Sequence, residues 1–165
     1  MRNFRKNIKI LKRELLEKKE DILIHFVGDI MLARDVGEKI KQYGPKFIIS
    51  AIQNITYKSD ILCGNLESPI SKKEIKLGGF KAPVESIEII KNFNLVNLAN
   101  NHIYDFNQFG LDDTLKLCRS KEINTVGAGE NLKQARQIPY KKHEETFIAI
   151  INIAENEWCS ASQFK

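Results

Sequence analysis

Long apolar runs are missing from this sequence of 165 residues. No stretch approaches the ~20 consecutive apolar residues that a membrane-spanning helix requires. The basic N-terminus also has no apolar core of the kind found in secretory signal peptides. A membrane-spanning protein and a conventionally secreted protein are therefore not predicted, and a cytoplasmic location is the default expectation.

Cysteine is scarce, and several nucleotide and hydrolase motifs are missing. The three cysteines, Cys63, Cys118 and Cys159, form no CxxC pair, so neither a disulfide framework nor a structural zinc site is supported. We expect buried free thiols. The chain contains no Walker A loop, no GxGxxG motif, no GxSxG motif and no internal repeat.

Positive charge is concentrated in residues 1–21. This segment holds eight Lys or Arg against four Asp or Glu, so only +1 of the net charge of +5 belongs to the rest of the chain. A nearly neutral body carries no electrostatic footprint for nucleic acid. The spacing of Phe4, Ile8, Leu11 and Leu15 predicts a basic amphipathic helix, which is either solvated or in contact with an anionic membrane surface or partner.

Short apolar runs alternate with helical patterns along the rest of the chain. Helices are predicted at residues 34–55 in two pieces divided by Gly44-Pro45, at 83–93, at 110–120 and after a cap at Asn131. Strands are predicted at 22–29 (buried), 59–67, from Leu95, at 124–129 and at 147–153, the last paired with 138–143. Helices between strands require parallel pairing, so the predicted fold class is α/β, a mostly parallel sheet with flanking helices.

Three successive predicted strands end in polar side chains. These endings are Gly28-Asp29, Gly64-Asn65-Leu66-Glu67 and Asn100-Asn101-His102. Ligands of open α/β sheets bind beyond the carboxyl ends of the strands. Two residues that are two positions apart in an extended segment share one side, so Asn65 and Glu67 can point at the same place. We therefore expect a polar site where the three strands end.

Carboxylate, amide and imidazole groups together suit a divalent metal such as Mn, Fe or Zn. A bridging carboxylate can hold two ions ~3.5–4 Å apart, as in two-metal hydrolytic sites, and a nearby histidine can protonate a leaving oxygen. Each ending also has a structural interpretation. Gly-Asp commonly ends a strand, Asn65 and Glu67 can shape a turn, and Asn100-Asn101 can form a left-handed turn with His102 merely hydrogen-bonded. The shared end of the sheet favours a site.

These motifs resemble the CapA family, named for poly-γ-glutamate capsule biosynthesis, within the calcineurin-like metallophosphatase superfamily. The resemblance implies that residues 22–165 form a partial domain of this type, the N-terminal half of a metallophosphatase-like α/β sandwich. The founding members of the family are membrane-associated, which is the alternative location. The matching stretches are residues 28–34, 64–69, 98–106, 110–115, 127–131 and 154–158.

The resemblance also implies metal ligands. By this comparison Asp29 is the ligand from the first motif, and Asn65 or Glu67 is the ligand from the second. Asn101 is the ligand from the third motif. The implied cofactor is Mn, Fe or Zn, with two ions in a complete parent protein.

Catalytic roles follow from the same resemblance. His102 matches the catalytic histidine and Asp105 its orienting partner, while Arg34 matches a family arginine near the site. Asn107 stands where the family usually has glycine, and asparagine tolerates the left-handed conformation that glycine adopts there.

Two departures from the family pattern concern the metal. Met31 stands where many metallophosphatases have the histidine of a D-x-H motif. The later G-H-x-H motif has no counterpart either, because only His143 follows His102. The expectation is therefore an N-terminal fragment that carries half of a metal site.

Three functions stay open at this point. The first is a metal-dependent phosphoesterase-like hydrolase, acting on a phosphate ester and complete only in a longer parent. The second is a non-catalytic binding or export factor for an anionic polymer such as poly-γ-glutamate. The third is an inactive truncated remnant. Whether the chain is an enzyme therefore stays an open question at the level of sequence.

Overall fold

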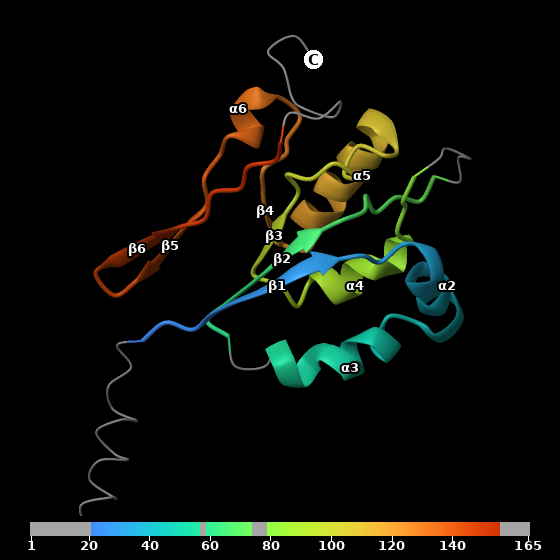
Figure 1. Ribbon diagram of the computed structural model, residues 1–165, viewed down its shortest axis with the longest axis horizontal. Coiled ribbons are helices and arrows are strands. Elements are labelled where there is room, and N and C mark those ends of the chain that lie inside the picture. Colours follow the sequence, from blue (N-terminus) through green and yellow to red (C-terminus); the bar gives the residue numbers. More distant parts are fainter. Residues whose placement is uncertain (1–20, 57–58, 74–78, 156–165) are drawn as a thin grey trace, which may run out of the picture.

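A computed structural model describes residues 21–56, 59–73 and 79–155 (Figure 1). The amphipathic helix predicted at residues 1–21 lies, apart from Asp21, outside this part of the chain, as do Cys159 and the end of the 154–158 motif. The strands are β1 (Ile24–Ile30), β2 (Ile61–Leu66), β3 (Leu95–Asn97), β4 (Asn124–Val126), β5 (Tyr140–His143) and β6 (Thr146–Ala149). The helices are α2 (Arg34–Tyr43), α3 (Lys46–Thr56), the 3-10 turn η1 (Val84–Ser86), α4 (Ile87–Ile90), α5 (Asn107–Ser120) and α6 (Leu132–Ala135).

The central sheet is parallel and has the strand order β1-β2-β3-β4. Each crossover between neighbouring strands contains helix, which is what parallel pairing requires. Strands β5 and β6 form a separate antiparallel hairpin in which Tyr140 pairs with Ala149. The predicted α/β class is confirmed. The predicted pairing of the strand at 147–153 with the segment at 138–143 is confirmed as well.

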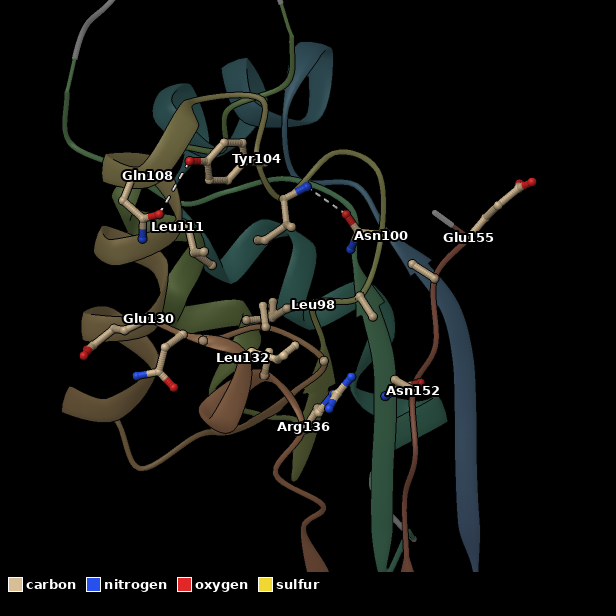
Figure 2. A pocket seen from close by; sticks show the side chains of 18 residues that line it. Leu98, Asn100, Tyr104, Gln108, Leu111, Glu130, Leu132, Arg136, Asn152 and Glu155 are labelled. Atoms are coloured by element: carbon tan, nitrogen blue, oxygen red, sulfur yellow. Dashed lines mark hydrogen bonds between the residues drawn. The ribbon is translucent and has the colours of Figure 1, made fainter. Parts of the chain in front are cut away.

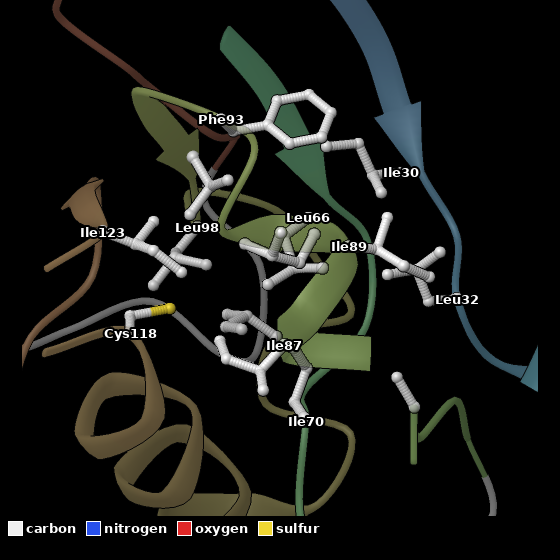
Figure 3. Packing of buried hydrophobic residues seen from close by; sticks show 14 of the residues in the cluster. Ile30, Leu32, Leu66, Ile70, Ile87, Ile89, Phe93, Leu98, Cys118 and Ile123 are labelled. Atoms are coloured by element: carbon white, nitrogen blue, oxygen red, sulfur yellow. The ribbon is translucent and has the colours of Figure 1, made fainter. Parts of the chain in front are cut away.

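One large hydrophobic cluster joins the helices to one face of the sheet (Figure 3). It contains side chains of α2, α4 and α5, together with Leu66, Val96 and Leu98, whose exposed fractions are all 0%. Burial of each such aliphatic side chain stabilises the fold by about 1.5–3 kcal/mol. The cluster therefore holds β2 and β3 rigidly, and these two strands carry much of the predicted site.

The opposite face of the sheet has a smaller cluster. Ile61, Cys63, Leu95 and Val126 are buried there, with partly buried apolar residues from the hairpin segment packed against them. Cys63 and Cys118 are both buried free thiols, as predicted. Burial raises the pKa of each, that of Cys118 to about 12.

Strand β1 is confirmed, but the prediction that it is buried was wrong for most of its length. Phe26 is 69% exposed and Val27 is 39% exposed, while Ile30 at the carboxyl end is buried. The reason is position in the sheet. In the sheet formed by the described residues, β1 lies at the edge with β2 on one side only, so its apolar residues have fewer neighbours than those of β2.

Local signals placed the helices well. Gly44, with φ of +78°, ends α2 before Pro45 and α3, and Asn131 caps α6 by accepting a hydrogen bond from the Gln134 backbone. The single helix predicted at 83–93 is instead the short pair η1 and α4. Among the residues described, no helix has the length and apolar character needed to cross a membrane.

Candidate functional site at the carboxyl ends of the strands

A bulge in β1 brings Asp29 into line with β2. Phe26 pairs with Cys63 but Asp29 pairs with Asn65, so β1 has one residue more than β2 over this interval. Gly28 lies within it at a φ of +74°, a conformation that glycine adopts without the steric penalty of a side chain. The Gly-Asp ending therefore has a structural cause, and its effect is to place a carboxylate beside Asn65.

Three polar side chains lie in register across three strands. Asp29 pairs with Asn65 and Asn65 pairs with Asn97. The Asn65 Nδ2 donates to Asp29 Oδ1 at 2.8 Å, and the Asn97 Nδ2 donates to Asn65 Oδ1 at 2.8 Å. The sequence prediction did not include Asn97. Its position at the end of a strand parallel to β2 is the signal that could have identified it.

Asn65 also joins the two predicted carboxylates. Its Nδ2 donates to Glu67 Oε1 at 2.5 Å as well as to Asp29. The expectation that Asn65 and Glu67 point to one place is thus confirmed. Both carboxylates converge on a single nitrogen, so their oxygens lie close together at the carboxyl ends of β1 and β2.

Asn100 fixes the loop that carries the predicted histidine. It is 7% exposed, and its Oδ1 accepts hydrogen bonds from the backbone of His102 at 3.0 Å and of Ile103 at 2.8 Å. Its Nδ2 donates to Leu66 O at 2.9 Å and to Asn65 Oδ1 at 3.0 Å. The sequence pointed to an Asn-Asn turn here, and the structure identifies the first asparagine as the residue that holds it.

Asn101 is exposed, in contrast to its neighbour. Its Nδ2 lies 3.3 Å from His102 Nε2. It sits at the outer side of the loop, where its side chain is accessible from solvent. Its role as a metal ligand stays a prediction.

His102 and Asp105 form the predicted pair. His102 Nδ1 lies 3.1 Å from Asp105 Oδ2, and His102 Nε2 lies 3.9 Å from Glu67 Oε2. Asp105 Oδ2 also accepts the Phe80 N–H at 2.7 Å. The imidazole is therefore held by the carboxylate on one nitrogen and presents the other toward Glu67.

Phe80 connects the histidine to Arg34. Its ring lies against the His102 ring with centroids 4.5 Å apart, and the Arg34 guanidinium lies 3.9 Å from the centroid of the Phe80 ring. Arg34 itself has a φ of +52° at the start of α2. Arg34 therefore lies near His102, as predicted, with the Phe80 ring between them. The sequence did not point to Phe80, because it lies in a lysine-rich loop with no strand or helix pattern.

Asn107 adopts the left-handed conformation that its place in the sequence implied. Its φ is +52°, and its backbone N–H donates to Tyr104 O at 2.8 Å as α5 begins. Asparagine is one of the few residues that tolerate this conformation. The substitution of glycine by asparagine is therefore compatible with the turn.

The predicted residues meet, but they do not form a complete metal-binding set. Within residues 21–56, 59–73 and 79–155, no group of three or more His, Cys, Asp or Glu is arranged to hold an ion. Asp29 and Glu67 converge, and His102 stands to one side of Glu67. Two carboxylates and nearby amides are suitable oxygen donors for a divalent cation.

Comparison with known proteins identifies the family. The family model of the bacterial capsule synthesis protein PGA_cap matches residues 23–164. The chain belongs to this family. The predicted membership of this family is therefore confirmed.

Two curated relatives of the chain are named for capsule or PGA biosynthesis. The chain is 30% identical over 145 residues to the capsule biosynthesis protein CapA of Bacillus anthracis. It is 34% identical over 148 residues to the PGA biosynthesis protein CapA of Bacillus subtilis (strain 168). Each match covers 82% of this chain, which spans only 35% and 38% of the lengths of these relatives.

Proposed function

We propose that this chain contributes a divalent-cation site and a histidine proton donor to a hydrolytic step in capsule biosynthesis, with a phosphate ester as the substrate class. The observation that carries the proposal is the convergence of Asp29 and Glu67 on one nitrogen beside the His102 imidazole. The names of the two relatives support the biological context.

Glu67 suits the role of second ligand better than Asn65 does. The Asn65 oxygen already accepts hydrogen bonds from Asn97 and Asn100, which use the two lone pairs of an amide oxygen. Its nitrogen occupies the space between the two carboxylates. Asn65 therefore positions Asp29 and Glu67, which have further lone pairs for a cation. Asn101, exposed beside His102, can turn its amide oxygen toward the same cation.

The protein groups around the cation have separate tasks. Asp29 and Glu67 would hold a divalent ion, which would supply Lewis-acid chemistry toward a phosphoryl oxygen or a water molecule. Asp105 holds Nδ1 of His102, so Nε2 is the nitrogen that carries a proton to a leaving oxygen. Phe80 fixes both members of the pair, through its N–H to Asp105 and its ring against His102.

Binding of manganese tests the cation site directly. We expect calorimetry on the full chain to detect Mn²⁺, and Asp29→Asn or Glu67→Gln to weaken binding by more than the about 10–100-fold that loss of an outer-shell partner costs. Glu144→Gln is the matched control, because Glu144 lies in the turn of the β5–β6 hairpin. Equal affinities in all four proteins would contradict the proposal.

Turnover of a generic phosphate ester tests the chemistry. We expect weak, Mn²⁺-dependent hydrolysis that His102→Ala abolishes and Asp105→Asn reduces. Cation binding with no hydrolysis that depends on His102 would instead favour a second function, the binding of an anionic capsule polymer without catalysis. The observation that favours this second function is that the described residues contain no group of three or more His, Cys, Asp or Glu arranged to hold a metal ion.

A further inference from the structure

The loop that carries His102 and Asp105 is held in part by its own asparagine. The Asn100 Oδ1 accepts the Ile103 N–H at 2.8 Å (Figure 2). Asn100 and Ile103 also line a pocket of about 250 Å³, and neither His102 nor Asp105 belongs to its lining. The His102–Asp105 pair is contacted instead by a segment from the connection between β2 and η1, which lies far from the loop in sequence.

Residues 79–82 form this second segment, which we call the return segment. Its end is fixed beside β2, because the Ala82 N–H donates to Pro69 O at 2.9 Å and Ile70 forms a bridge with Ala82. Ile70 and Ala82 are both 0% exposed, and the Thr114 hydroxyl of α5 accepts the Ile70 N–H at 2.8 Å. This buried base therefore determines where the return segment meets the loop.

Gly79 is the residue of the return segment that lies against the Asp105 carboxyl group. Its φ is +121°, and a Cβ at this position would lie 2.7 Å from both the Cβ and the Oδ2 of Asp105. Carbon atoms in van der Waals contact are ~3.5–4.0 Å apart, so a side chain here displaces either Asp105 or the segment. The close approach lets the next residue, Phe80, donate its backbone N–H to Asp105 Oδ2 at 2.7 Å.

The same carboxylate oxygen determines the state of His102. Asp105 Oδ2 lies 3.1 Å from His102 Nδ1, and the Asp105 side chain is 9% exposed. An ionised carboxylate only accepts hydrogen bonds, so the proton of the neutral imidazole belongs on Nδ1, and Nε2 keeps its lone pair. Without the Phe80 N–H, rotation of the Asp105 carboxyl group about its own side-chain bonds would remove the acceptor from Nδ1.

We infer that Gly79 is a positioning residue, which sets the tautomer and orientation of His102 through the Phe80 N–H and Asp105. The N–H and the ring of Phe80 are separable, because a leucine at position 80 keeps the first and removes the second. The effect of Gly79 on turnover rests on the proposed function. Its effect on the tautomer does not, because the tautomer is a property of the metal-free chain.

Nitrogen-15 NMR of the imidazole rings in the full, metal-free chain tests the inference. The sequence has three histidines, so His102→Gln identifies the His102 signals. The spectra are recorded at about pH 9, well above the ordinary histidine pKa of ~6.5, where the two neutral tautomers give distinct signals. We expect the Nδ1–H tautomer in the unaltered chain. In Gly79→Ala we expect the Nδ1–H tautomer to be largely replaced by the Nε2–H tautomer.

Gly44→Ala is the matched control for backbone strain. Gly44 also has a positive φ, +78°, but a Cβ there meets no other residue of the described chain within 4 Å. This variant and Phe80→Leu, which retains the N–H, should both keep His102 in the Nδ1–H tautomer. An unchanged tautomer in Gly79→Ala would overturn the inference. So would an equal loss of the Nδ1–H tautomer in Gly44→Ala, because strain alone would then explain the effect.

Asp105→Ala tests the same contact without adding an atom, so the inference stays testable if Gly79→Ala does not fold. Loss of the acceptor should move the Phe80 amide signal strongly and release His102 from the Nδ1–H tautomer. An unchanged Phe80 amide signal would contradict the Phe80–Asp105 hydrogen bond on which the inference depends.

Turnover separates this inference from the proposed function. If the chain hydrolyses a phosphate ester, Gly79→Ala should lower kcat by at least about tenfold, as part of the ~10²–10⁴-fold that general acid–base catalysis contributes, without a change in Mn²⁺ affinity. A chain that hydrolyses no ester but shows the expected tautomers contradicts only the proposed function. Hydrolysis that Gly79→Ala leaves unchanged, with His102 still in the Nδ1–H tautomer, contradicts only the inference.

Discussion

Replacement of Asn100 by alanine should destabilise the fold more than replacement of any other polar residue in the strand-end loops. The Asn100 side chain makes several hydrogen bonds, and two of its partners, Ile103 N and Leu66 O, belong to residues that are 5% and 0% exposed. The alanine variant leaves both buried groups without a partner. A buried unsatisfied group costs about 1–3 kcal/mol, so we expect a loss of about 3 kcal/mol.

The size of this loss is decisive because domains of this kind have free energies of unfolding of only about 5–15 kcal/mol. Urea unfolding followed by far-UV circular dichroism in metal-free buffer measures it. Asn101→Ala is the matched control. Its side chain is exposed and, among the residues that the structure describes, hydrogen-bonds only to the outer nitrogen of His102, so we expect a change below about 0.5 kcal/mol.

The outcome has a clear refutation. If Asn100→Ala and Asn101→Ala unfold within about 0.5 kcal/mol of each other, which is the usual range for surface changes, Asn100 does not hold the loop. If the difference is as large as expected, the backbone amide signals of His102 and Ile103 should also move strongly in Asn100→Ala. That second result would tie the stability loss to the two backbone groups that Asn100 satisfies.

Two further predictions concern backbone conformation and pH. Asn107→Gly should leave stability unchanged or slightly raised, whereas Asn107→Val should cost about 1–2 kcal/mol in urea unfolding, because φ at this position is +52°; equal stability of the two variants would argue against a left-handed turn. Burial raises the pKa of Cys118 to about 12 from 9.0, so above pH 9 the unfolded thiol loses its proton while the folded one keeps it. The free energy of unfolding should therefore fall as pH rises through this range, by at most about 1.4 kcal/mol per pH unit. In unfolding curves measured from about pH 8 to 10, the free energy of unfolding of Cys118→Ala should fall less steeply with pH. The same pH dependence in both proteins would contradict the raised pKa of Cys118.

Much of the fold follows from local patterns in the sequence. The continuous apolar run at β2 is buried on both faces of the sheet, and the spacing of Leu111, Leu115 and Cys118 gives α5 its buried face. Gly44 and Asn131 mark helix ends for reasons of backbone geometry and capping. These features depend on residues a few positions apart, so their physical causes are contained in short stretches of sequence.

The candidate site can be predicted from short stretches of sequence only in part. Parallel strands and their polar endings predicted that Asp29, Glu67 and His102 would meet, and they do. Sequence could not separate Asn100 from Asn101, because two adjacent asparagines in a loop have the same composition and the same turn preference. In the folded domain Asn100 is buried, whereas Asn101 is exposed to solvent.

The sequence by itself determined the alternation of strands and helices, the family and the kinds of side chain at the ends of the strands. Tertiary structure decided the rest. It put β1 at an edge and so exposed Phe26, aligned Asn97 with Asn65, and brought Phe80 between Arg34 and His102. The physical reason is that strand order, register and contacts between distant segments are set by packing of the whole domain, whereas local periodicity specifies only which faces are apolar.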